Sequence, residues 1–223
     1  MAELILTIAL APTLVVLATL VARRWGDTVG GIVIAVPVVA GPILLVLGLE
    51  HGAGFVDRAA RGALLGIVAV GAFCVAAGRC VRFGWGIAIA AGWLAYAAST
   101  AALASIDPTV WLALAAALGA IAVARALLRA PPAAAGPSPE PPWWDLPARA
   151  GATALLVVAL TSAASALGPT VTGLLTPFPV ATSVVVAFTL SHAGPGPALH
   201  ALRGYLTGLP GFAAFFVVVT LLT

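Results

Sequence analysis

The sequence GDTVGGIVIAVPV (residues 26–38) returns 142 residues later as GPTVTGLLTPFPV (residues 168–180). Extended without gaps, Gly26–Gly66 aligns with Gly168–Gly208. This alignment holds thirteen identical pairs in 41 positions, where about five are expected by chance from this composition. The pairs include a proline, an arginine and several glycines, which a general excess of alanine and leucine does not produce. We therefore interpret the chain as containing an internal repeat, the alternative being a recurring apolar helix motif without common descent.

The composition places this repeat in a membrane. Of the 223 residues 62% are apolar and 8% are charged, and all ten basic residues are arginines with no run longer than two. Soluble domains contain about 25% charged residues because polar side chains must cover their core. The composition predicts an all-α integral membrane protein. It excludes a soluble enzyme, a disordered scaffold and a nucleic-acid-binding protein, which requires a basic tract.

Eight stretches contain the roughly 20 apolar residues that a bilayer-spanning helix needs. They are 4–22, 28–49, 59–77, 84–104, 109–128, 150–167, 171–190 and 199–222. A proline-rich segment follows the fifth stretch and ends near Trp143 and Trp144, a pair typical of an interfacial anchor. The chain thus divides into a first half with five helices (1–129), a cytoplasmic linker (130–149) and a second half with three helices (150–223).

The arginines predict the orientation of these spans. With eight spans, eight arginines fall on one side of the membrane, and only Arg58 and Arg61 fall on the other. Because basic residues are enriched in cytoplasmic loops, the side with eight arginines is predicted to be cytoplasmic. Both termini are then extracytoplasmic.

The two copies of the repeat are predicted to lie upside down relative to each other. Five spans separate equivalent helices, and an odd number reverses the direction in which a copy crosses the membrane. Helices one to three then correspond to helices six to eight as an inverted-topology repeat, and the fourth and fifth helices have no counterpart. Such repeats are typical of transporters, in which two halves exchange roles around a central site.

Two proline-interrupted spans are the predicted centre of this site. Proline removes a helical hydrogen bond, and within hydrocarbon the freed carbonyl groups need another partner. Interruptions at matching positions of both copies favour a binding site at the midplane of the membrane. A kink that only improves helix packing is the other interpretation. The candidate substrate-binding residues here are Pro37, Gly41, Thr176, Pro179, Thr182 and Ser183.

The motif Arg-Gly-x-x-x-Gly also occurs in both copies, beginning at Arg61 and Arg203. Glycines four residues apart let two helices approach closely. An arginine at the N-terminal end of a helix is unfavourable without a partner. Arg61 has Glu50 or Asp57 nearby, whereas the loop before Arg203 holds no acidic residue. Both arginines are candidates to bind an anionic substrate or a lipid phosphate, and a role in topology and headgroup contact is the alternative.

Catalytic chemistry is not predicted. The three histidines and the two cysteines have no spacing that suits a metal ion. No acidic or basic residue lies at the centre of a span, and no nucleophile with a nearby base is evident. Asp107, which precedes Pro108, is expected to cap a helix. The sequence thus predicts no enzyme, no catalytic residue, no metal and no cofactor.

The stretch from Gly173 to Pro179, followed by Ala201-Leu-Arg203, resembles the small bacterial GlpM-like inner-membrane proteins. Those proteins have a comparable Gly…Phe-Pro helix and a following helix that begins with Ala-Leu-Arg. The resemblance covers a minor part of the chain, and the spacing between motif and arginine differs. It implies a multi-pass protein of the bacterial inner (plasma) membrane and a link to exopolysaccharide production, and it transfers no functional residue.

These patterns lead us to expect a transporter of a small anionic or amphipathic solute that works by alternating access around the second and seventh helices. The alternative is a non-transporting lipid-binding or assembly partner in envelope polysaccharide synthesis. The expected partners are the lipid bilayer and a small-molecule or lipid substrate, with no nucleic acid. The unmatched fourth and fifth helices could complete the first half or form a homodimer.

Overall fold

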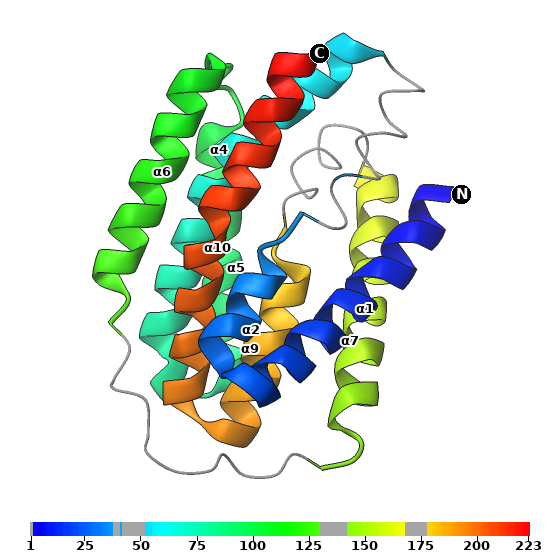
Figure 1. Ribbon diagram of the computed structural model, residues 1–223, viewed down its shortest axis with the longest axis vertical. Coiled ribbons are helices and arrows are strands. Elements are labelled where there is room, and N and C mark those ends of the chain that lie inside the picture. The colour runs from blue at the N-terminus through cyan, green and yellow to red at the C-terminus, as the bar shows by residue number, and fades with distance from the viewer. Residues whose placement is uncertain (1, 38–40, 42–51, 130–141, 168–177) are drawn as a thin grey trace.

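The computed structural model describes residues 2–37, 41, 52–129, 142–167 and 178–223. Within these residues the secondary structure is helical and contains no β-strand, which confirms the predicted all-α fold class. The elements, shown in Figure 1, are α1 (Ala2–Trp25), α2 (Asp27–Ile34), α4 (Ala53–Cys80), the short 3-10 helix η1 (Val81–Phe83), α5 (Trp85–Leu103), α6 (Val110–Leu127), α7 (Asp145–Leu167), α9 (Val180–Ala193) and α10 (Pro195–Leu222).

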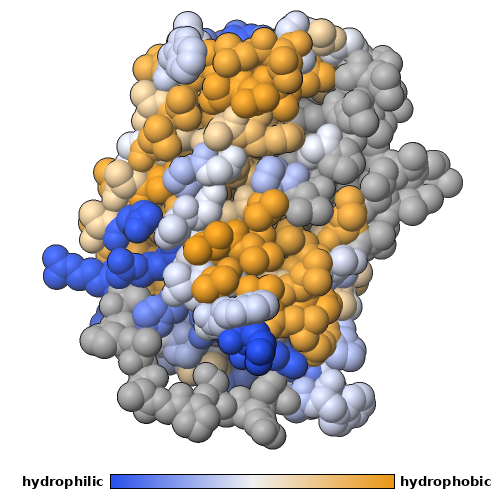
Figure 2. Space-filling view, in the orientation of Figure 1, coloured by the Kyte–Doolittle hydropathy of each residue, from blue (hydrophilic) through white to orange (hydrophobic). Residues whose placement is uncertain are grey.

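The outer surface of this bundle is apolar. Four helical segments of the described part are long and apolar enough to cross a membrane: α4 with η1, α5, α6 and α10. Large apolar side chains face outward, among them Leu94 (72% exposed), Trp111 (62%) and Leu155 (71%). Figure 2 shows broad apolar areas on one face of the molecule. Because water would oppose so much exposed apolar surface, these features are typical of a helical membrane protein.

Several helices begin earlier than the sequence indicated, α4 and α7 by the largest margins. α4 begins at Ala53, directly after Gly52, whose φ of 82° sets a sharp entry into the helix. α7 begins at Asp145, so the predicted linker (130–149) extended too far into the chain. The reason is Pro147, which lies in the first turn of α7. A proline is tolerated there because the amide N–H it lacks would have no helical partner.

α2 packs very closely against α10. A side chain at Gly31 would overlap the backbone of Ala201, and one at Gly204 would overlap the backbone of Thr28. Gly208 lies against Ile32 in the same interface. The predicted close approach of helices at the second Arg-Gly-x-x-x-Gly motif is therefore confirmed, with α2 as the partner.

A helix ends or begins next to each member of the proline pair. α2 ends at Ile34, and Pro37 lies outside regular structure. α9 begins at Val180, directly after Pro179, which occupies the N-cap position. α2 and α9 contact each other. Figure 1 shows that the C-terminal end of α2 and the N-terminal end of α9 lie at a similar level, about midway along the bundle.

α4 and α10 have the same length and the same kind of start. Each contains 28 residues, and each follows a glycine with positive φ, Gly52 at 82° and Gly194 at 88°. These two glycines are 142 residues apart in the sequence, as are the first residues of the two helices. The helices pack against each other and run in opposite directions (Figure 1). α1 and α7 likewise pack together and run in opposite directions.

Most arginines gather at one end of the bundle. The C-terminal ends of α1, α4 and α6 and the N-terminal ends of α7 and α10 lie toward the lower end in Figure 1. Gly78 of α4, for example, lies beside Leu128 and Leu199. The N-terminal part of α4, with Arg58 and Arg61, lies toward the other end. The segments at or near these helix ends contain Arg23, Arg24, Arg79, Arg82, Arg125, Arg129, Arg149 and Arg203.

Candidate functional site

The start of α9 lies against aromatic side chains of α5. The ring of Phe178, which precedes the helix, has its centre 5.5 Å from that of Trp93 and 5.3 Å from that of Tyr96. The contact with Tyr96 is edge-to-face, an arrangement that aromatic quadrupoles favour. Tyr96 is only 2% exposed. The segment before α9 therefore lies against large, rigid side chains of α5.

Ser183 fixes α9 to α5. Its hydroxyl donates to the Pro179 carbonyl oxygen at 2.7 Å and accepts a hydrogen bond from the Trp93 indole N–H at 2.9 Å. Ser183 is 3% exposed. This hydroxyl already donates one hydrogen bond and accepts another within the protein. It therefore holds the segment around Pro179 in place and has no free hydrogen to donate to a solute.

Thr182 connects α9 to α10. It is 2% exposed, and its side chain interacts with the hydroxyl of Tyr205. Tyr205 also belongs to the close contact between α10 and Gly31. Thr182 and Tyr205 thus place uncharged hydroxyl groups between α9 and α10, and α10 is the helix that packs against α2.

The structure describes two of the other three predicted central residues, Pro37 and Gly41. Pro37 is partly buried beyond the end of α2, and Gly41 lies beside the ring of Phe215 on α10. Thr176 lies outside the described residues. The structure therefore brings Pro179, Thr182 and Ser183 together at the start of α9, and α2, which ends three residues before Pro37, contacts α9.

Arg61 is part of a local ion-pair group. Its guanidinium lies 2.6 Å from Asp57 and 3.3 Å from Asp107, and it donates to the Pro108 carbonyl oxygen at 3.4 Å. The predicted pairing with Asp57 is confirmed. The predicted helix-capping role of Asp107 is wrong: Thr109 is the N-cap of α6, and its side-chain oxygen accepts from the Leu112 N–H.

Arg203 differs from its repeat counterpart. It is partly buried near the start of α10, and among the described residues no acidic group forms an ion pair with it. Since α4 and α10 run in opposite directions, Arg61 and Arg203 lie toward opposite ends of the bundle. Neither joins the residues around Pro179.

Sequence reasoning missed a buried charged group, which we call the Asp145 cluster: Arg23, Asp145, Arg149 and His192. One carboxylate oxygen of Asp145 lies 2.7 Å from Arg23 and 3.0 Å from Arg149. The other lies 3.7 Å from Nδ1 of His192. The Asp145 side chain is 1% exposed and that of Arg149 is 7% exposed. The cluster joins the ends of α1, α7 and α9.

Further contacts tie the Asp145 cluster to α9. Arg149 donates to the carbonyl oxygen of Val185 at 3.4 Å, and its guanidinium lies 5.2 Å from the centre of the Phe188 ring. The His192 ring packs edge-on against Trp144, with ring centres 5.3 Å apart. The available sequence signal was Asp145 and Arg149 four residues apart, a spacing that pairs charges on one helix.

Asp27 adds a second acidic group near this end. It precedes the predicted second span by one residue. Burial raises the pKa of its carboxyl, while the nearby His200 and Arg149 act in the opposite direction and lower it. Asp27 therefore adds a carboxyl group of α2 to the charged side chains that α1, α7 and α10 bring to the lower end of the bundle.

These two regions differ in what they can do. The surroundings of Pro179 supply hydroxyl groups and aromatic faces without a charged side chain among the residues described there, which suits contact with an uncharged or amphipathic molecule. The Asp145 cluster can hold helix ends together.

Within the described part of the chain, no group of histidine, cysteine and acidic residues could bind a metal ion. No family model, curated protein or solved structure matches the chain.

Proposed function

We propose that this chain is a membrane transporter that moves a small amphipathic solute by alternating access, with the interrupted α2 and α9 at its centre. The observation that carries the proposal is that α2 ends shortly before Pro37 and α9 begins directly after Pro179, two prolines that are equivalent in the sequence alignment. Backbone groups freed at such breaks are common substrate contacts in transporters. Hydroxyl and aromatic groups of Trp93, Thr182 and Tyr205 surround the second break.

The inverted repeat belongs to this proposal. It is supported by the matching starts and equal lengths of α4 and α10, and by the opposite directions of these helices and of α1 and α7. Helices one to three would then be related to helices six to eight by a two-fold axis in the membrane plane. Two halves related in this way give inward-open and outward-open states of similar energy.

The orientation also remains part of the proposal. The gathering of eight arginines at one end supports a cytoplasmic assignment for that end, with eight spans and both termini outside, in a bacterial inner membrane. In this arrangement the Asp145 cluster would close the cytoplasmic side by tying α9 to α1 and α7. Substrate access from that side would require the cluster to open.

The charge of the substrate follows from the partners of the two arginines. Arg61 is neutralised by Asp57 and Asp107, so it contributes little attraction for an anion. Arg203 is the better candidate to attract an anionic group, on the cytoplasmic side of the proposed path. An amphipathic solute would place its polar group toward Arg203 and its apolar part near Trp93 and Tyr96.

Topology can be tested by cysteine labelling. Gly54 and Gly196 are equivalent in the repeat, and each lies at the start of its helix. In a background with C74A and C80A, we expect G54C and G196C to react with a membrane-impermeant thiol reagent from opposite sides of the membrane. Labelling of both from the same side would contradict the inverted repeat.

Transport can be tested in vesicles that contain the purified chain. We would measure the entry of an uncharged polyol, a monocarboxylate and a single-chain phosphate ester. Faster entry of the phosphate ester, reduced by R203Q but not by R58Q, would support the proposal. If none of the three solutes moved and the chain copurified with a polysaccharide synthase, the assembly-partner alternative would be favoured.

A further inference from the structure

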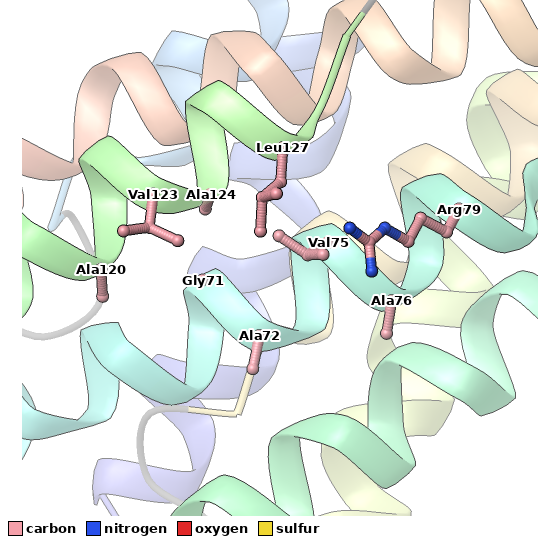
Figure 3. Close-up of a pocket in the computed structure, with 9 residues that line it drawn as sticks. All are labelled: Gly71, Ala72, Val75, Ala76, Arg79, Ala120, Val123, Ala124 and Leu127. Atoms are coloured by element: carbon pink, nitrogen blue, oxygen red, sulfur yellow. The ribbon is translucent and has the colours of Figure 1, made fainter.

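A surface groove runs between α4 and α6, away from the region around Pro179 (Figure 3). Its volume is about 370 Å³. Small side chains form it, because Gly71, Ala72 and Ala76 on α4 face Ala120 and Ala124 on α6. Larger residues at the same positions would fill the space between the two helices. The groove is therefore a direct consequence of the alanine- and glycine-rich sequences of both helices.

The groove opens on the apolar outer surface. Val123 and Leu127 line it and are 58% and 47% exposed. Both helices belong to the segments that are long and apolar enough to cross a membrane. In a bilayer, an apolar groove at this position faces lipid acyl chains, and no protein segment among the described residues covers it.

One charged residue lines the groove. Arg79 lies at one end, and Figure 3 shows its guanidinium directed back toward Val75. It is exposed and forms no ion pair with any residue that the structure describes. Arg79 also lies at the end of the bundle where eight arginines gather, which is where the phosphate groups of a bilayer leaflet would be.

We propose that this groove binds an anionic phospholipid, with one acyl chain between α4 and α6 and the phosphate against Arg79. The shape and the charge agree with this occupant. The narrow apolar part suits a single flexible hydrocarbon chain, and a guanidinium forms paired hydrogen bonds to phosphate oxygens. The inference does not depend on the transport proposal, because the groove lies on another face of α4.

A second copy of the chain fits the groove less well. Helix association through this face would bury Arg79 with no acidic partner on its own chain, and an unpaired buried charge strongly opposes association. A phospholipid supplies the missing negative charge itself. The same argument favours an anionic lipid over a zwitterionic one, whose positive headgroup offsets the phosphate.

The test uses the full chain in vesicles of phosphatidylcholine with a minor fraction of phosphatidylglycerol. Electron paramagnetic resonance of spin-labelled lipids would report the fraction of each lipid immobilised by the protein. We expect phosphatidylglycerol to be immobilised in preference to phosphatidylcholine. R79Q should reduce this preference about fivefold, because it removes the one arginine that lines the groove next to the lipid phosphate. R58Q, which removes an exposed arginine at the other end, is the matched control and should leave the preference unchanged.

A second variant tests the groove itself. A72L should fill it and release the immobilised chain of either lipid, whereas A98L, at an exposed position on α5, should have no effect. An equal affinity for the two lipids, or a preference that R79Q leaves intact, would overturn the proposal. A chain that is dimeric in detergent and becomes monomeric with A72L would instead assign the groove to a second copy.

Discussion

Asp145 and Arg149 form a buried ion pair one helical turn apart, with Nε of Arg149 3.0 Å from the Asp145 carboxylate. The same carboxylate oxygen binds Arg23 of α1, so a single acidic group pairs with two arginines. Arg149 in turn donates to a carbonyl group of α9. Three helices therefore depend on one side chain for their mutual position at this end of the bundle.

D145N should destabilise the protein. The amide cannot neutralise Arg149, whose side chain is 7% exposed, and removing one member of a buried ion pair typically costs about 3–5 kcal/mol. Unfolding in mixed detergent micelles, followed by circular dichroism, would measure the loss. D107N is the control: the Asp107 side chain is 78% exposed, and its ion pair should contribute at most about 1 kcal/mol. Equal effects of the two substitutions would show that the Asp145 cluster is not structural.

G204V should separate α2 from α10. A side chain at position 204 would overlap the backbone of Thr28, and backbone cannot move aside as a flexible side chain can. Overpacking of this kind costs typically about 1–3 kcal/mol. Thermal unfolding would measure it, with G119V as the control because nothing lies within 4 Å of the position where its side chain would begin. The prediction fails if the two variants unfold at the same temperature.

W93F should weaken the attachment of α9 to α5 while keeping the aromatic contact with Phe178. The substitution removes the indole N–H that donates to Ser183, and a hydrogen bond of this kind contributes about 1 kcal/mol. Hydrogen exchange of the backbone amides in α9 should therefore become faster. W111F is the control, since Trp111 is 62% exposed at the start of α6. Unchanged exchange in W93F would show that other contacts hold α9.

The sequence predicted the helices and their breaks because those features are local. Apolar length identifies a span, and a proline in the interior of a helix removes a hydrogen bond and often ends or kinks the helix. The end of α2 before Pro37, the start of α9 after Pro179 and the close contact at Gly204 were therefore accessible from residue patterns. The start of α7 was missed because Pro147 was interpreted as part of a linker, although the first turn of a helix accepts proline.

The Asp145 cluster was not accessible in the same way. Its members come from positions 23, 145, 149 and 192, so three helices must be placed before their charges meet. Trp143 and Trp144 predict an interfacial anchor in this region, and residue patterns alone do not show that the neighbouring Asp145 is buried. Similarly, the ion pair of Arg61 with Asp107 depends on how the loop before α6 lies against α4, which spacing alone does not specify.

The decisive comparison for the transport proposal is between two prolines. P179A should let helical structure extend through the break before α9, because alanine restores the amide N–H and relieves the clash with the preceding turn. The protein should remain folded, but flux of the transported solute in vesicles should fall. The backbone carbonyl groups at the centre would then accept hydrogen bonds within the helix and would no longer be available to the solute. P210A removes a proline inside α10, where the helix is continuous and the residue is exposed. That variant should gain stability, by up to about 3 kcal/mol, and keep its flux. If P179A transported as well as the unmodified chain, the interruption would be a packing kink, and the site would have to lie elsewhere.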